Sequence, residues 1–274
     1  MFFQLADIVF HIVCPLKLRV EETIRDFLVP QTTPDITIET EWGDLSQEPE
    51  GRKIFDSGGT WQLYQSGEEY FFSLSSPLLS PIPYKLARMN KDFTRGKILL
   101  HEPHFDRNQP VNPLEYPLDE LLLINFLALG KGVDIHACGI TDQLGQGRLF
   151  VGQSGAGKTT IARLLEETEG ITILSDDRII LRQVDHTLWM YGTPWHGEAR
   201  LASPARAPLS QVYFLEKGSR NELASQKRAE ALGRLFACSF LPFYSPEGLA
   251  FTLGFLEKVV KATPCHVLKW LPDK

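Results

Sequence analysis

A glycine-rich segment in the second half of the chain has the residue types and the spacing that phosphate binding requires. The segment matches the pattern G-x-x-x-x-G-K-[ST] in full, and it lies between a strand-like run at residues 148–151 and a helix-like run at residues 160–166. Glycines allow consecutive backbone N–H groups to point toward phosphate oxygens, and the start of a helix adds positive potential. The residues expected to bind a nucleotide are Gly152, Gln153, Ser154, Gly155, Ala156, Gly157, Lys158, Thr159 and Thr160.

Two side chains at the end of this segment would complete a nucleotide site. Lys158 could reach the β- and γ-phosphates, and the hydroxyl of Thr159 could be a ligand of Mg²⁺. The alternative is a glycine-rich turn that merely links a strand to a helix. The strand and helix patterns on either side favour the nucleotide site, so ATP and Mg²⁺ are the expected cofactors.

Two adjacent carboxylates, Asp176 and Asp177, follow a short apolar strand-like run at residues 171–174. Asp176 lies 18 residues after Lys158, which leaves room for one helix and a return to a neighbouring strand. We therefore expect both acids at the edge of the sheet beside the glycine-rich segment. One carboxylate could hold Mg²⁺ and the other could accept the proton of an attacking hydroxyl. A pair of turn carboxylates is the alternative.

Composition excludes several other classes of protein. The net charge of −6 and the absence of a Lys/Arg run argue against nucleic-acid binding. The four cysteines are isolated, which favours buried thiols in a reducing compartment over disulfides or zinc ligands; they are Cys14, Cys138, Cys238 and Cys265. The N-terminus lacks a basic leader and no apolar run is long enough to span a bilayer, so we expect a cytoplasmic protein without a membrane partner.

The chain divides into two parts by its hydrophobic periodicity. Residues 1–112 form a β-rich domain of unknown role, with a helical pattern at residues 20–28, alternation at residues 36–42 and a hairpin around Ser66-Gly67-Glu68. Residues 101–113 are rich in proline and charge and indicate a linker or surface loop. Residues 113–274 form the second domain, and the whole is predicted to be α/β (α+β).

The second domain alternates helical and strand patterns. We expect strands at residues 133–140, 149–151, 171–174, 178–182, 188–191, 211–215 and 265–271, and helices at residues 118–129 and 226–237. A further helix begins at Ser245-Pro246-Glu247, and its predicted buried face consists of Leu249, Leu253, Leu256 and Val260.

At these residues the chain resembles the HPr kinase/phosphorylase superfamily, which includes kinases of lasso-peptide precursors and, more distantly, phosphoenolpyruvate carboxykinases. The resemblance covers residues of about 117–271 and rests on a histidine-bearing strand at 133–139, the segment 152–159 and Ser175-Asp176-Asp177-Arg178. The blocks at residues 192–198 and 206–209 are similar to an HPr-kinase-related subgroup. The resemblance implies a P-loop, HPr kinase/carboxykinase-like nucleotide-binding domain.

The resemblance also implies roles for single residues. Asp176 resembles the general base, Asp177 the metal-side carboxylate and His136 the family histidine near that base. A protonated His136 would keep the aspartate ionised, whereas a neutral one would let the pKa of the aspartate rise. A core histidine is the alternative reading of His136.

Three further residues are candidates for the metal or the substrate. His196 and Glu198 could reach the metal or substrate from a loop, or they could belong to a polar turn. Arg206 could stabilise charge on the transferred phosphoryl group, or it could be an exposed arginine.

The function implied is an ATP-dependent kinase that transfers the γ-phosphoryl group to a hydroxyl, foremost a serine of a small protein or peptide. The E-I-R-G-type stretch and the helical tail of true HPr kinases are absent from this sequence, which argues against HPr itself as acceptor. A kinase of a small-molecule hydroxyl and a nucleotide-binding sensor without transfer are the alternatives. The family analogy also implies a homo-oligomer.

Overall fold

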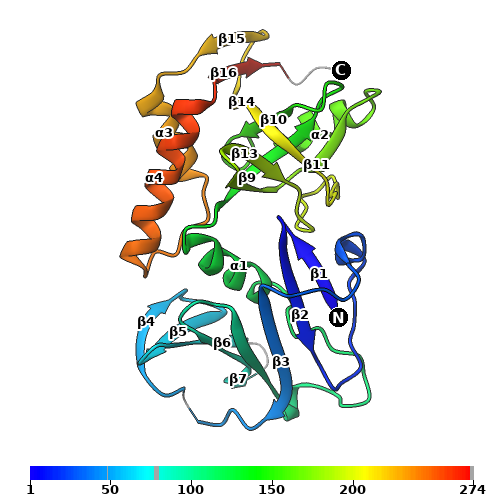
Figure 1. Cartoon of the computed structure of the whole chain (residues 1–274), viewed down its shortest axis with the longest axis vertical. Coiled ribbons are helices and arrows are strands. Elements are labelled where there is room, and N and C mark those ends of the chain that lie inside the picture. Colours follow the sequence, from blue (N-terminus) through cyan, green and yellow to red (C-terminus); the bar gives the residue numbers. More distant parts are fainter. Residues whose placement is uncertain (48, 77–79, 272–274) are drawn as a thin grey trace. The chain divides into compact units, whose positions relative to one another are not determined.

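The computed structural model describes residues 1–47, 49–76 and 80–271. The chain is mixed α/β and contains two large sheets of eight strands each, with few helices (Figure 1). It divides into two compact units, Met1–Phe126 and Leu127–Lys274. The division falls within a helix, α1 (Leu118–Ala128), whereas the sequence placed it after residue 112.

The first unit is built on one mixed sheet. Its strands are β1 (Phe2–Leu5), β2 (Ile8–Val13), β3 (Ile36–Gly43), β4 (Arg52–Asp56), β5 (Trp61–Ser66), β6 (Glu69–Ser76), β7 (Ser80–Asn90) and β8 (Arg95–His101), and their order in the sheet is β1-β2-β3-β8-β7-β6-β5-β4. The predicted alternation in β3 is confirmed, because Ile36 and Ile38 are fully buried. The β5–β6 hairpin is also confirmed, with Gly67 in the left-handed conformation that its turn requires.

The helical pattern at residues 20–28 was only partly right. The structure has a 3₁₀ helix, Glu22–Phe27, in which Phe27 is the buried residue. One buried side chain cannot hold a longer amphipathic helix against a core, so the segment forms a short turn of helix instead. A second 3₁₀ helix, Glu102–His104, lies in the stretch expected to be a linker.

The second unit alternates strands with helices. After α1 its elements are β9 (Val133–Thr141), β10 (Gly147–Val151), α2 (Lys158–Glu166), β11 (Thr172–Ser175), β12 (Arg178–Val184), β13 (Thr187–Tyr191), β14 (Arg206–Lys217), β15 (Glu222–Ser225), α3 (Arg228–Ala237), α4 (Pro246–Ala262) and β16 (Cys265–Trp270). All strands and helices expected in this part are present. The added strand, β15, consists of exposed residues and so had no hydrophobic pattern to reveal it.

The strand pairings of this unit bring several strand ends to one edge of the sheet. β9 is antiparallel to both β10 and β11, so β11 runs in the direction of β10. β10 is also parallel to β14, and β14 is parallel to β16. The carboxyl ends of β11, β10, β14 and β16 therefore lie at the same edge, and the segments that follow them can meet there.

Helices cover the two faces of this sheet unequally. One face packs against α3 and α4 through a core that includes Ile135, Leu235 and Leu256. The opposite face packs against α2 through a smaller core that includes Cys138 and Ile161. Alternation along β9 sends Ile135 and Cys138 to opposite faces, as the period of a strand requires.

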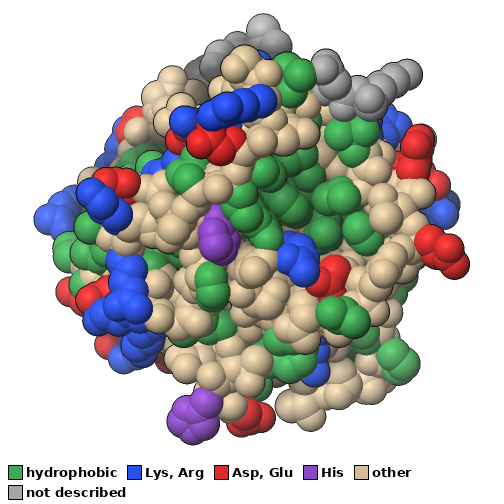
Figure 2. Space-filling view, turned by 90° about the horizontal axis from the view of Figure 1, so that it is seen from above, with side chains coloured by type: hydrophobic (Ala, Val, Ile, Leu, Met, Phe, Trp, Pro, Cys, Tyr) green, Lys and Arg blue, Asp and Glu red, His purple; other side chains and the backbone are tan. Residues whose placement is uncertain are grey.

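Hydrophobic side chains remain partly exposed on the face that α2 covers. Tyr213 and Leu268 pack at the margin of its core and are only half-buried. The view from above in Figure 2 shows a group of hydrophobic side chains near the middle of the visible face, with charged side chains of both signs around them. Among the described residues, no helix is long and apolar enough to cross a membrane.

The buried face of α4 differs from the predicted one. Leu256 and Val260 are buried as expected, but Leu253 is 46% exposed, and Thr252 and Phe255 point inward instead. The face is rotated because Gly248 lets the helix approach its neighbours closely. A Cβ at Gly248 would lie 2.8 Å from Pro242 and 3.3 Å from Ala128.

Ser245 caps α4, and its removal should destabilise the second unit. Its hydroxyl accepts a hydrogen bond from the backbone N–H of Gly248 at 3.0 Å. We expect Ser245→Ala to lower the free energy of unfolding by about 1 kcal/mol, measured by denaturant titration. Ser219→Ala, at an exposed position without a cap, is the matched control. Equal stability of the two variants would contradict the capping role.

Candidate functional site

A cavity of about 490 Å³ lies at the edge of the second sheet where β10, β11, β14 and β16 end. The residues that line it are His136, Ser154, Gly155, Gly157, Lys158, Thr159, Thr160, Asp176, Asp177, Gly197, Glu198, Lys217 and Trp270. Most of the residues singled out in the sequence are in this set, although they come from four separate stretches of the chain. The structure thus brings two lysines, two threonines, a histidine and three carboxylates to one cavity.

The glycine-rich segment owes its shape to glycine and to Trp270. Gly157 precedes α2 in the left-handed conformation, with φ of 103°, and a Cβ there would lie 2.0 Å from the indole ring of Trp270. The indole Nε1 donates a hydrogen bond to the carbonyl of Ala156 at 3.3 Å. Both the backbone angle and the close approach exclude a larger residue at position 157.

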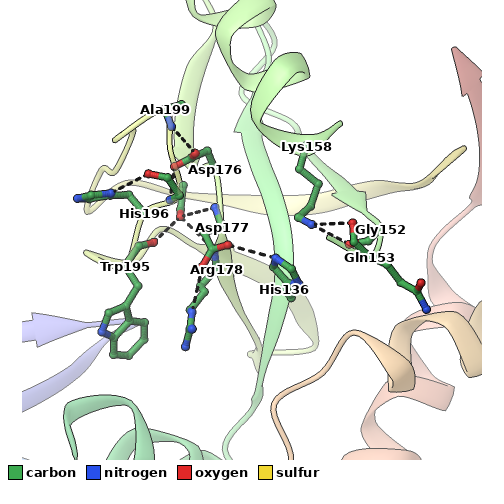
Figure 3. A network of polar contacts seen from close by, with 12 residues as sticks. His136, Gly152, Gln153, Lys158, Asp176, Asp177, Arg178, Trp195, His196 and Ala199 are labelled. Carbon is green, nitrogen blue, oxygen red and sulfur yellow. Dashed lines mark hydrogen bonds and ion pairs between the residues drawn. The ribbon is translucent and has the colours of Figure 1, made fainter. Parts of the chain in front are cut away.

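The side chain of Lys158 folds back over the glycine-rich segment. Its Nζ donates hydrogen bonds to the carbonyls of Gly152 at 2.8 Å and Gln153 at 3.3 Å (Figure 3). Burial lowers the pKa of Lys158, and nearby Asp177 opposes that shift. A phosphate would compete with these two carbonyls for the same ammonium donors.

Asp176 holds the loop that follows β13. Its Oδ1 accepts from the backbone N–H of Gly197 at 2.8 Å, and its Oδ2 accepts from that of Ala199 at 3.0 Å. The side chain is buried, and a Cβ on Gly197 would lie 2.7 Å from Oδ2, so the loop approaches the carboxylate as closely as glycine allows. These contacts place Glu198 at the cavity wall.

Hydroxyl groups fix the turn that carries the two aspartates. Ser175 Oγ accepts from the backbone N–H groups of Asp177 and Arg178 at 3.2 Å each, and it donates to the carbonyl of Trp195 at 2.8 Å. Thr193 Oγ1 donates to the carbonyl of Arg178 at 2.8 Å. Both hydroxyls are buried. They join the turn at residues 175–178 to the loop at residues 193–195 where solvent does not reach.

Asp177 faces His136, in contrast to the expectation that the histidine would stand near Asp176. His136 Nε2 lies 3.2 Å from Asp177 Oδ1, and Arg178 Nε lies 3.2 Å from Asp177 Oδ2 (Figure 3). The Asp177 side chain is 26% exposed and that of His136 is 30% exposed, so solvent can reach both. The Arg178 guanidinium is held over the ring of Phe240 at 4.2 Å.

A further carboxylate, Asp134, is buried on the same face of β9 as His136. Neither of its oxygens has a hydrogen-bond partner in the part of the chain that the structure describes. Burial raises the pKa of Asp134 well above the usual range of a carboxyl group, and the charge of Asp177 raises it further. Both effects favour the protonated form of Asp134.

Five sequence candidates do not line the cavity: Gly152, Gln153, Ala156, His196 and Arg206. The Nδ1 of His196 lies 3.0 Å from the carbonyl of Gly197, on the far side of Asp176 from Lys158 in the view of Figure 3. Arg206 begins β14, at the edge of the sheet opposite to the glycine-rich segment, because β14 is parallel to β10. Its guanidinium lies 4.6 Å from the centre of the Trp189 ring.

Two residues that line the cavity had no signal in the sequence. Lys217 ends β14, and Trp270 ends β16. Neither belongs to a motif, and both reach the cavity only because these strands are parallel to β10. The order of parallel strands, which one sequence does not provide, would have identified them.

The oxygen donors at the cavity fit a magnesium site that a nucleotide completes. Thr159, Asp177 and Glu198 all line the cavity, and hydroxyl and carboxylate oxygens are the ligands that Mg²⁺ prefers. Within the described residues, no group of three or more His, Cys, Asp or Glu side chains is arranged to hold a metal by itself. Mg²⁺ usually takes one or two carboxylates and completes its shell with phosphate and water, so the donor set suits a nucleotide-bound ion.

Comparison with models of known protein families finds no match to this chain. Comparison with curated proteins finds no matching relative either.

Replacement of Asp134 by asparagine should remove a pH-dependent loss of stability. The unfolded chain releases the Asp134 proton in the usual carboxyl range, whereas the folded protein retains it because the native pKa is raised. The free energy of unfolding therefore falls as the pH rises from the unfolded pKa toward the native one. We expect Asp134→Asn to gain stability over wild type as the pH rises through this window, measured by thermal unfolding. A constant difference between the two proteins at all pH values would contradict a raised pKa.

Proposed function

We propose that this protein is an ATP-dependent kinase that transfers the γ-phosphoryl group to a hydroxyl. The observation that carries the proposal is the shared cavity, where Lys158 and Thr159 meet Asp176, Asp177 and His136. A strand, a glycine-rich turn and a helix precede the acids, in the order that phosphoryl transfer enzymes use. Positioning and charge neutralisation account for most of the catalysis of this reaction, and the cavity walls supply groups for both.

The glycine-rich segment is the phosphate-binding part of the proposed site. Gly155 and Gly157 leave the backbone N–H groups before α2 accessible, and the helix N-terminus adds positive potential. Lys158 would exchange the carbonyls of Gly152 and Gln153 for phosphate oxygens. A Mg²⁺ ion bound by Thr159 and a cavity carboxylate would neutralise charge on the transferred group.

The contacts favour Asp177 as the residue that accepts the proton of the attacking hydroxyl. Asp176 already accepts two backbone hydrogen bonds and is buried, whereas Asp177 is partly exposed and lies against His136. In the transfer, the acceptor oxygen bonds to the γ-phosphorus as its proton passes to the Asp177 carboxylate. The bond from the γ-phosphorus to the bridging oxygen breaks, and ADP leaves with that electron pair.

The acceptor class follows from the sequence resemblance, which indicates a serine hydroxyl of a small protein or peptide. His136 orients the Asp177 carboxylate toward the cavity through its Nε2 contact. Asp176 acts as a positioning residue, because it fixes the loop that carries Glu198.

The test is phosphoryl transfer from γ-labelled ATP with Mg²⁺ to host-cell extract separated into protein, peptide and small-molecule fractions. We expect Asp177→Asn to lower kcat by about 10²- to 10⁴-fold while ATP binding survives, since the proton acceptor is lost. Asp176→Asn should lower the rate of transfer and speed amide hydrogen exchange at residues 195–200, because one backbone N–H loses its acceptor. Lys158→Ala should lose ATP binding.

A matched control separates these effects from a general effect of charge removal. Asp185→Asn makes the same chemical change at an exposed turn between β12 and β13, and it should leave transfer unchanged. Label confined to small molecules would instead identify a small-molecule kinase. ATP binding without label in any fraction would indicate a sensor and contradict the kinase proposal.

Affinity for ATP should fall in the alkaline range at a lower pH than an ordinary lysine would produce. Burial lowers the pKa of Lys158, so the ammonium loses its charge earlier than a solvent-exposed lysine as the pH rises. Calorimetric titration of ATP over alkaline pH should show this loss in wild type. Lys158→Met should bind weakly with a flat profile, and an equal slope in both proteins would show that another group titrates.

A further inference from the structure

A second cavity, of about 380 Å³, lies on the other side of the glycine-rich segment. It is lined by Val151, Gly152, Gln153, Ser154, Gly155, Ala156, Phe214, Leu215, Lys217, Arg234, Ala237 and Cys238. Ser154, Gly155 and Lys217 line both cavities, so the two spaces adjoin at the bend of this segment. Three residues that were expected to bind the nucleotide line the second cavity and not the first; they are Gly152, Gln153 and Ala156.

The two cavities differ in chemistry. The first is lined by the carboxylates of Asp176, Asp177 and Glu198. The second has no acidic residue among its described lining residues, and its walls are largely apolar. Phe214 and Leu215 form one wall from the end of β14, and the last turn of α3 forms another. A volume of this size is within the range of small-molecule sites.

Arg234 gives the second cavity a fixed planar group. Its guanidinium lies 4.7 Å from the centre of the Phe214 ring, and its Nη1 donates to Glu216 Oε1 at 2.7 Å. A guanidinium held in this way keeps one orientation and can stack on a flat aromatic ligand. The wall thus combines apolar surface with a cationic plane.

The strand order sets the direction in which a nucleotide would lie. The acids follow β11, which is separated from β10 by β9, and β14 is on the opposite side of β10. A nucleoside triphosphate is an extended molecule with its transferred group at one end and its base at the other. With the γ-phosphate beside Asp177, the base must point across the glycine-rich segment toward β14 and α3.

We propose that the second cavity binds the base and ribose of the nucleotide, and that Lys217 contacts its phosphates where the cavities adjoin. This assignment rests on the proposed function and adds the location of the nucleoside. The base stacks on the Arg234 guanidinium, which lies over the buried Phe214 ring. Lys217 is exposed at the end of β14. Its ammonium can therefore contact the phosphates without breaking an interaction with a buried group.

The experiment compares binding of ATP and of inorganic tripolyphosphate to Ala237→Trp. Ala237 is exposed at the cavity, so an indole there narrows the cavity without changing the core. We expect at least about a tenfold loss in ATP affinity with tripolyphosphate affinity unchanged, because only ATP needs the second cavity. Ala229→Trp, an exposed position in the first turn of the same helix, should bind both ligands as wild type does.

A second measurement does not depend on a bulky substitution. Cys238 lines the cavity and is partly exposed, so its alkylation rate reports on access, in a Cys14→Ser background that removes the other partly exposed thiol. ATP should slow alkylation of Cys238, whereas tripolyphosphate should not.

The outcomes separate this inference from the proposed function. Unchanged ATP affinity in Ala237→Trp, or alkylation that ATP does not slow, would overturn the nucleoside assignment while wild-type ATP binding leaves the kinase proposal standing. Wild type that binds neither ATP nor tripolyphosphate would overturn both.

Discussion

The parallel pairing of β10 with β14 determines where the functional side chains of the second unit lie. Because β11 and β16 run in the same direction, four strands deliver their carboxyl ends to one edge. The glycine-rich segment leaves β10 at the middle of that edge, with the aspartates on one side and Lys217 on the other. A shift of one residue in the β10–β14 register would turn Phe214 to the opposite face of the sheet and remove the wall of the second cavity.

Buried polar groups, more than apolar packing, give the cavity its form. Three buried side chains form hydrogen bonds with backbone groups of two loops; they are Asp176, Ser175 and Thr193. Each of these bonds is made by a buried side chain, so the loss of one partner would leave the other unsatisfied at a cost of about 1–3 kcal/mol. Asp134 is the exception, since its oxygens have no partner in the described part of the chain, and burial raises its pKa. Asp177 remains partly exposed at the cavity, in contrast to Asp176 and Asp134.

Sequence and structure agree most closely where local pattern and tertiary packing require the same thing. The strand before Gly152 and the helix after Gly157 were both expected from periodicity, and both are present. Sequence and structure differ where several arrangements fit the local pattern equally well and tertiary packing selects one of them. The inward face of α4 is rotated toward Phe255, because Gly248 permits a close approach that no periodicity rule anticipates. Arg206 was a candidate for contact with the phosphoryl group, with an exposed arginine as the alternative, and the direction of β14 places it at the other edge.

By itself the sequence determined the mixed α/β class, the order of elements in the second unit and the residues of the glycine-rich segment. These depend on contacts within a few residues, which hydrophobic period and glycine content record directly. Only the tertiary structure decided that His136 faces Asp177 rather than Asp176, and that Lys217 and Trp270 reach the same cavity. Those contacts join residues from separate strands, and their geometry is set by strand order and register, which no local pattern in a single chain encodes.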